Sequence, residues 1–171
     1  MTPQFHLPLQ SGSNEILDVM NRRYTAEKYL EILDYIKEKL PDAALSTDII
    51  VGFPGESEED FKKTLDILSY VKYDMVFSFI YSPRSGTPAA RMENAIPEDV
   101  KTERMRRLLD LQTEIASDLN AKCIGKTYRV ICQGKSKNND GMLEGRTEGN
   151  KIVLFKTTPD NVGKFIKVKI T

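Results

Sequence analysis

The segment from residue 46 to residue 60 restricts the fold of this chain more than any other. Three β-branched residues at positions 49–51 run directly into the turn-forming segment 52–55, and Ser57 with Asp60 forms a capping box that opens a helix. A short apolar run bounded in this way is typical of a buried parallel strand that feeds a turn and a helix. Ligands of α/β proteins gather at the carboxyl ends of such strands, so we expect a binding site there.

Asp48 is a carboxylate within this apolar strand. Burying an unpaired charge costs free energy, so its side chain should either face a polar ligand or hold a basic partner. Gly52 also has two interpretations, because a residue without a side chain lets a ligand approach the backbone and equally serves as an ordinary turn residue. The sequence leaves both alternatives open at both positions.

Length and composition narrow the class of protein. The chain has 171 residues, 40% hydrophobic and 29% charged, which suits one domain of fair size or a medium domain with a small one. Its apolar runs are too short to span a membrane, and residues 1–4 show no signal-peptide pattern, so we expect a cytoplasmic protein with no membrane partner. Cys123, Cys132 and His6 form no metal-binding motif, so we expect no metal ligands in this chain.

The net charge of zero hides a difference between two parts of the chain. Residues 125–171 contain ten Lys and Arg against four Asp and Glu, a balance of +6, whereas residues 1–124 contain fifteen against twenty-one, a balance of −6. A neutral chain with a basic end indicates two modules, of which the second meets a polyanion. A lysine-rich surface that merely stays solvated is the alternative.

Strand and helix patterns alternate through the first part of the chain. Pro8 lacks an N–H for a ladder, so the first strand should lie at an edge, and that free edge could pair two copies of the chain. Apolar strands that alternate with amphipathic helices predict a parallel sheet or barrel segment. We expect strands at 5–9, 46–51 and 75–81, and helices at 14–20, at 26–39 after the cap Thr25, from Ser57 through Val71, and from Pro97 to just before Gly125.

The pattern changes after the long helix. Short β-rich runs at 127–132, 142–146, 152–155 and 165–170 are separated by Gly, Asn, Asp and Pro. Several short strands within so few residues predict a small antiparallel barrel. We therefore divide the chain into domains 1–122 and 123–171.

Several motifs in order carry a resemblance to a known family. Residues 7–13 (LPLQSGS), 20–22 (MNR), 46–56 (STDIIVGFPGE) and 81–89 (YSPRSGTPA) resemble the radical S-adenosylmethionine methylthiotransferases. Residues 144–147 and 150–151 resemble the TRAM RNA-binding domain that ends those enzymes. The branch that methylthiolates isopentenylated adenosine in tRNA fits better than the ribosomal-protein branch, which matches less well at residues 21–22 and 82–84.

The resemblance implies a fold, cofactors and partners. It implies the last three strand–helix units of a (β/α) barrel, then an OB-like TRAM barrel, with S-adenosylmethionine and tRNA as partners. Such enzymes hold 4Fe-4S clusters, one of them through a CxxxCxxC motif, and carry a further amino-terminal domain; this sequence contains neither the motif nor the domain. We therefore expect part of a longer enzyme that lacks catalytic residues and activity on its own.

The resemblance also implies roles for individual residues. Gln10 and Arg22 match positions that hold the methionyl part of the cofactor, although Arg22 could equally be a solvated arginine. Phe79 is more typical of core, whereas Tyr81 at the strand end is open to core or cofactor. Arg84 is a candidate contact to a substrate phosphate or base. In full, the candidate cofactor residues are Gln10 and Ser11, Arg22, Ser46 and Asp48 toward the ribose and amino groups, Val51 and Gly52 beside the adenine, and Tyr81.

Basic residues of the second module are candidates for RNA contacts, because small barrels with basic loops commonly hold RNA through its phosphates. Lys167 and Lys169 alternate with apolar positions of the last strand and should face solvent. Two functions stay open, a methylthiotransferase part and a non-catalytic RNA-binding module on an α/β scaffold. The candidate RNA contacts are Lys126, Arg129, Lys135, Lys137, Arg146 and Lys151.

Overall fold

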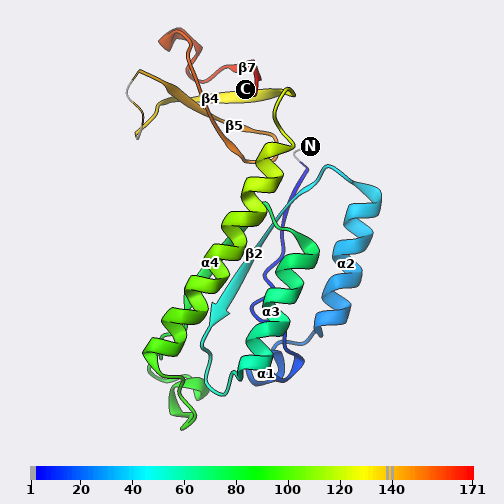
Figure 1. Cartoon of the computed structure of the whole chain (residues 1–171), viewed down its shortest axis with the longest axis vertical. Helices are drawn as coiled ribbons and strands as arrows, with labels where there is room; N and C mark the ends of the chain where they lie inside the picture. The colour runs from blue at the N-terminus through cyan, green and yellow to red at the C-terminus, as the bar shows by residue number, and fades with distance from the viewer. Residues whose placement is uncertain (1–2, 138, 140) are drawn as a thin grey trace.

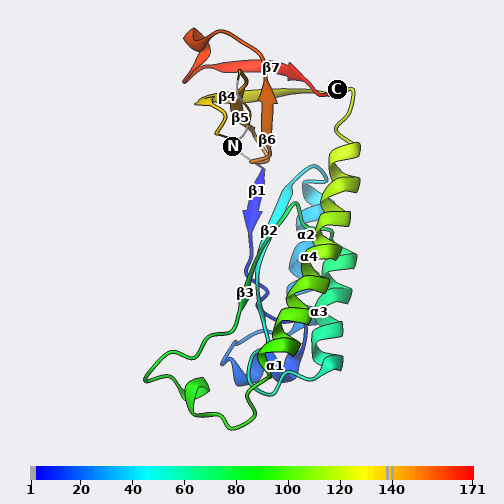
Figure 2. The same ribbon diagram turned by 60° about the vertical axis from the view of Figure 1, so that its left-hand side comes forward.

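The structure is a computed structural model that describes residues 3–137, 139 and 141–171. Its first part is a parallel sheet of three strands in the order β1-β2-β3. The three long helices lie on one side of this sheet (Figure 1, Figure 2). The predicted α/β architecture is therefore confirmed. The elements are β1 (Gln4–His6), α1 (Asn14–Val19), α2 (Ala26–Lys39), β2 (Ala44–Val51), α3 (Glu58–Val71), β3 (Met75–Ile80), a 3-10 turn η1 (Pro88–Arg91) and α4 (Glu98–Ala121).

Helix α3 begins where the sequence predicted. The Ser57 hydroxyl accepts a hydrogen bond from the Asp60 backbone N–H at 3.1 Å, and the Asp60 carboxylate accepts one from the Ser57 backbone N–H at 3.0 Å. This reciprocal capping satisfies two N–H groups that a helix start leaves without partners. The cap fixes the direction in which the chain leaves β2, and α3 then buries Phe61 and Leu68 against the sheet.

Strand β1 is shorter than predicted, because its ladder stops before Pro8. The Leu7 backbone N–H still donates to the Ser46 carbonyl at 3.0 Å, but the Leu9 N–H donates to the Thr47 hydroxyl instead. A proline cannot continue the ladder of backbone donors, so the chain is held to β2 by a side chain at this point. Gln10 then rejoins β2 at an isolated bridge.

The second part is an antiparallel sheet in the order β6-β5-β4-β7 with its own small core. A register shift between Cys132 and Gly134 marks a bulge in β4. The sheet is not closed into the predicted barrel: within the described residues β6 pairs only with β5, and β7 only with β4. The elements are β4 (Thr127–Lys135), β5 (Leu143–Thr147), β6 (Ile152–Phe155), a 3-10 turn η2 (Pro159–Asn161) and β7 (Phe165–Lys169).

The β5–β6 turn joins the two parts. The Lys151 ammonium lies 2.8 Å from an Asp74 carboxylate oxygen, just before β3, and 3.4 Å from the Asn120 amide oxygen at the end of α4. A Cβ added at Gly149 would lie 3.2 Å from the Ala44 Cβ, so the turn packs directly on the start of β2. The second sheet thus sits at the amino ends of the parallel strands, as Figure 2 shows.

Candidate functional site

A pocket of about 500 Å³ lies at the carboxyl ends of the parallel strands. This volume is in the range of sites that hold cofactor-sized ligands. Its walls combine polar and aromatic side chains from three neighbouring segments, as expected where parallel strands end. The lining includes Gln10, then Asp48, Ile50 and Phe53 from β2 and its turn, then Phe79, Tyr81 and Arg84 from β3 and the loop after it.

Gln10 is fixed at the level of Asp48 by its own backbone. Its N–H donates to the Asp48 carbonyl at 2.8 Å, and its carbonyl accepts from the Ile50 N–H at 3.0 Å. Its φ of 69° lies in the left-handed region, which is uncommon for a residue with a side chain. Such strained conformations persist only where the surrounding structure holds them, and they occur often at ligand-binding sites.

Asp48 has a histidine as its basic partner. One carboxylate oxygen lies 3.5 Å from His6 Nε2, and His6 Nδ1 lies 3.0 Å from the Ser46 hydroxyl oxygen. With Nε2 protonated toward the carboxylate, Nδ1 accepts a hydrogen bond from Ser46. The Asp48 side chain keeps 29% of its surface exposed, so it can still accept hydrogen bonds from a ligand. Ser46 is buried behind it and orients the histidine without lining the pocket.

Tyr81 lines the same pocket. Its ring meets Phe53 edge-on, with 5.0 Å between the ring centroids. Its Oη is buried and has no hydrogen-bond partner among the residues described here. A buried polar group without a partner costs free energy, so Tyr81 is a residue whose hydroxyl the described fold leaves unsatisfied. Gln10 and Asp48 beside aromatic walls suit a ligand that is polar at one end and has a flat ring.

Other predicted cofactor residues lie outside this pocket. Arg22 is exposed after α1, and it is held there through its backbone N–H, which donates to the Leu17 carbonyl at 2.8 Å. The buried Ser11 hydroxyl accepts from the Ser13 N–H, and Val51 lies in the core. The structure therefore brings Gln10, Asp48, Tyr81 and Arg84 together, and leaves out Ser11, Arg22, Ser46, Val51 and Gly52.

The space beside Gly52 is occupied by a lysine from α4. A Cβ added at Gly52 would lie 2.4 Å from Lys101 Cγ, so the absent side chain gives room to Lys101. The adjacent Glu56 is fully buried: its carboxylate accepts from the Gly52 N–H and from Arg104 Nη1, each at 2.8 Å. Burial raises the pKa of Glu56 above its usual range, against the opposing effect of these two donors. Sequence reasoning missed this cluster, because no local pattern links residue 56 with residue 104.

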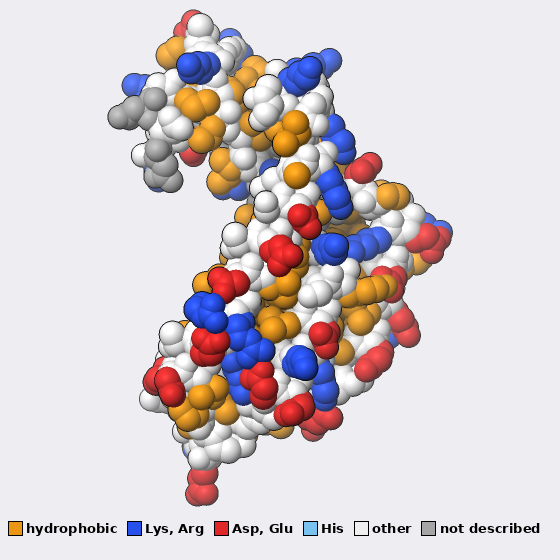
Figure 3. Space-filling model, in the orientation of Figure 1, with side chains coloured by type: hydrophobic (Ala, Val, Ile, Leu, Met, Phe, Trp, Pro, Cys, Tyr) orange, Lys and Arg blue, Asp and Glu red, His pale blue; other side chains and the backbone are white. Residues whose placement is uncertain are grey.

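The candidate RNA contacts differ in their surroundings. Arg146 donates through Nη1 to the Asn150 amide oxygen at 2.9 Å, and Lys151 is paired with Asp74, so both are held within the chain. The Arg129 guanidinium lies over the Phe165 ring, 4.1 Å from its centroid. The side chains of Lys126, Lys135 and Lys137 are exposed. Figure 3 shows acidic side chains gathered over the α/β part and few over the second sheet.

Side chains that could bind a metal are scattered over the described part of the chain. In the described residues, no group of three or more His, Cys, Asp and Glu side chains could hold a metal ion, and Cys123 and Cys132 are free thiols. The same residues include no helix that combines the length and the apolar surface needed to cross a bilayer.

Two segments of the chain match known families. Residues 2–68 match the Radical SAM superfamily, and residues 121–171 match the TRAM domain. The chain therefore carries a segment similar to the radical SAM superfamily and a segment similar to the TRAM domain, as its motifs predicted. The first match includes β1, β2 and four residues of the pocket, Gln10, Asp48, Ile50 and Phe53.

Several similar proteins share one name, tRNA-2-methylthio-N(6)-dimethylallyladenosine synthase. The chain is 52% identical to that of Acetivibrio thermocellus, over 96% of this chain and 34% of the relative, and 53% identical to that of Aquifex aeolicus, over 96% and 37%. It is 49% identical to that of Carboxydothermus hydrogenoformans, over 97% and 38%. The chain thus spans about a third of the length of these relatives. The predicted similarity to the tRNA-modifying branch is confirmed.

Proposed function

We propose that this chain supplies the cofactor pocket and the RNA-binding module of a radical S-adenosylmethionine enzyme that methylthiolates isopentenylated adenosine in tRNA. The observation that carries the proposal is the pocket at the strand ends, where Gln10, Asp48 and Tyr81 line one cavity. The names of relatives about half identical to the chain support the reaction class.

We propose the division into domains 1–122 and 123–171, and a cytoplasmic location consistent with the free thiols.

Each pocket residue has a role that suits its chemistry. The Asp48 carboxylate accepts hydrogen bonds from the hydroxyl or amino groups of the cofactor, and His6 holds it in position. The Gln10 amide can donate and accept, while Phe53 and Phe79 offer apolar surface to a flat ring. When bound, S-adenosylmethionine together with a 4Fe-4S cluster supplies the radical chemistry of this class. The protein's own task here is to bind and orient the cofactor and exclude water.

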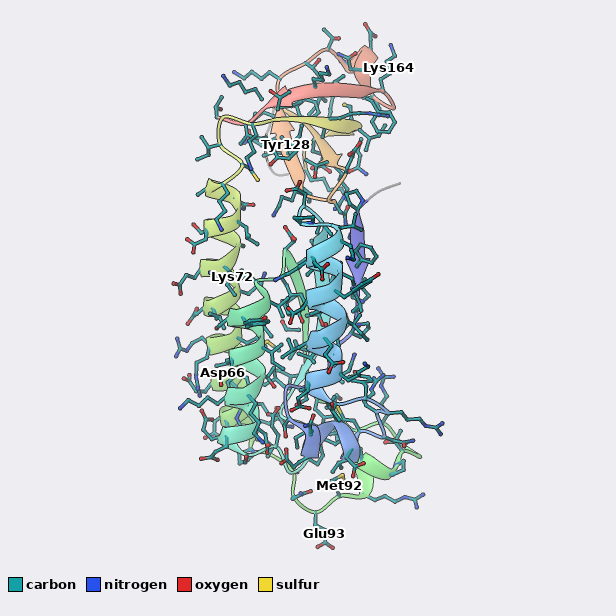
Figure 4. All side chains as sticks on the ribbon, turned by 90° about the vertical axis from the view of Figure 1, so that its right-hand side faces the viewer. Asp66, Lys72, Met92, Glu93, Tyr128 and Lys164 are labelled. Atoms are coloured by element: carbon teal, nitrogen blue, oxygen red, sulfur yellow. The ribbon has the colours of Figure 1, made fainter. Side chains whose placement is uncertain are left out.

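Calorimetric titration of the chain with S-adenosylmethionine tests the proposal. We expect saturable binding, and a loss of about ten-fold or more in affinity for Asp48→Asn, since charge-assisted hydrogen bonds contribute about 1.5–3 kcal/mol. Asp66→Asn is the matched control, because Asp66 is an exposed carboxylate on α3 (Figure 4). Absence of binding to the wild-type chain, or equal binding by Asp48→Asn, would favour a non-catalytic RNA-binding module instead.

A further inference from the structure

Side chains alternate between the two faces along β7 and along β4 as far as the bulge after Cys132. Val130, Cys132, Ile166 and Val168 belong to the core of the second sheet, so their neighbours point outward. The outward residues of β4 include Arg129, and those of β7 are Phe165, Lys167 and Lys169. We call the surface formed by Arg129, Phe165, Lys167 and Lys169 the β4–β7 face.

Cations on this face lie opposite each other. Arg129 pairs with Lys167 in the strand register, and Lys169 follows on the same side of β7. Like charges directly opposite in a sheet are destabilising. In the part of the chain that the structure describes, none of these three side chains has an ion pair or a side-chain hydrogen bond. An arrangement that repels itself and has no internal counter-charge is suited to an external polyanion.

An aromatic side chain stands within the same cluster. Phe165 is 58% exposed, and the Arg129 guanidinium lies 4.1 Å from its ring centroid, one step diagonally across the strand pair. The exposed Phe165 ring contributes little to the core. A guanidinium plane held against an aromatic ring is a surface on which a nucleobase can stack.

The position of the face leaves it free for a ligand. The β5–β6 turn is the part of the second sheet that packs on the α/β part, through Gly149 and Lys151. Strands β4 and β7 lie farther from the parallel sheet than the β5–β6 turn does (Figure 2). Lys164, directly before β7, lies near the end of the molecule (Figure 4). Arg146 and Lys151, which are held within the chain, are therefore weaker candidates than Lys167 and Lys169.

We propose that the β4–β7 face binds an unpaired stretch of RNA, with one base stacked on the Arg129–Phe165 pair and phosphates on Lys167 and Lys169. The inference rests on the proposed function only in taking RNA as the ligand. Stacking requires a base whose flat face is free, which a single strand or loop offers and a continuous duplex does not. Phosphate contacts alone would treat single strands and duplexes alike.

Fluorescence anisotropy of the full chain with a labelled single-stranded RNA of about ten nucleotides, and with an RNA duplex, tests the assignment. Phe165→Leu should weaken single-strand binding by about five-fold or more, and leave duplex binding nearly unchanged. Phe165→Tyr, which keeps the ring, should bind as the wild type does. Lys167→Gln with Lys169→Gln should reduce the log–log salt slope for the single strand by about 1.4, or about 0.7 for each phosphate that the protein no longer neutralises.

Tyr35 and Lys39 on α2 form the matched control, since Lys39 Nζ lies 5.6 Å from the centroid of the Tyr35 ring, which is 62% exposed. Tyr35→Leu with Lys39→Gln should leave RNA binding unchanged. If the wild-type chain binds no RNA, or binds only anionic lipid vesicles, the RNA function of the module fails together with the inference. If the chain binds RNA and folded Phe165→Leu and Arg129→Gln bind as tightly as wild type, the RNA function stands and the β4–β7 face is overturned.

Discussion

At the scale of single residues, the candidate pocket contains a strained backbone, a partly exposed carboxylate and a hydroxyl without a hydrogen-bond partner in the described part of the chain. Gln10 keeps a left-handed backbone, Asp48 keeps exposed carboxylate surface, and the Tyr81 hydroxyl is buried without a partner among the described residues. By comparison, the buried Tyr73 hydroxyl donates to the Tyr29 hydroxyl at 2.9 Å. The Tyr73 hydroxyl therefore contributes a hydrogen bond to the fold, whereas the Tyr81 hydroxyl contributes none among the described residues.

Replacing these two tyrosines by phenylalanine separates the two roles. Tyr73→Phe removes a satisfied buried hydrogen bond and should lower the free energy of unfolding by about 1 kcal/mol. Tyr81→Phe removes a hydroxyl without a partner, so without ligand its stability should be unchanged or slightly higher. Urea unfolding of both variants measures the difference. An equal loss of stability in both would mean that Tyr81 has a structural partner.

Two residues of the pocket lie in or directly after predicted strands, and their roles toward the cofactor stay a prediction. Asp48 and Tyr81 could be placed near one site, because parallel strands end at one edge of a sheet. The assignments of Arg22 and Gly52 came from the resemblance, and this structure puts Arg22 on the surface and the Lys101 side chain against Gly52. No periodicity within one element could reveal that contact, since it joins positions far apart in the chain.

At the scale of elements, α4 supports the turn that follows β2. Arg104 reaches the buried Glu56, and Lys101 fills the space beside Gly52. The helix therefore holds in place the turn that carries Phe53, one wall of the pocket. Helix and strand order was predictable from alternating periodicities, and the Ser57–Asp60 cap was predictable because all its groups are local. The docking of α4 was not, because a buried pair between distant elements leaves no local pattern.

Two glycines with the same backbone conformation test this support. Gly52 has a φ of 74° with Lys101 against it, whereas Gly86 has a φ of 85° with nothing within 4 Å. Gly86→Ala should lower the free energy of unfolding by about 1 kcal/mol, which reflects backbone strain alone. Gly52→Ala should cost clearly more, and adding Lys101→Ala should recover the difference. Thermal or urea unfolding measures all three; equal losses at the two glycines would contradict a tight contact with α4.

At the scale of the whole molecule, the two candidate surfaces lie at opposite ends. The pocket is at the carboxyl ends of the parallel strands, near the loop that carries Met92 and Glu93, and the second sheet is at their amino ends (Figure 4). Helix α4 runs between the two ends, and the Lys151–Asp74 ion pair fixes the second sheet on the first. A ligand that contacts both surfaces must therefore be long, as an RNA is. Pairing of two copies through the edge of β1 stays a prediction.

The central claim is that S-adenosylmethionine binds at the pocket beside Asp48, and His6 offers the most direct test. It is the single histidine of the chain, so its imidazole signals in NMR spectra need no separation from others. Because Nε2 lies 3.5 Å from the Asp48 carboxylate, a cofactor that binds this carboxylate must change the surroundings of the ring. We predict that titration with S-adenosylmethionine shifts the His6 ring signals in a saturable manner, and that Asp48→Asn weakens the effect. Saturable binding of the cofactor with unshifted His6 signals would contradict the account.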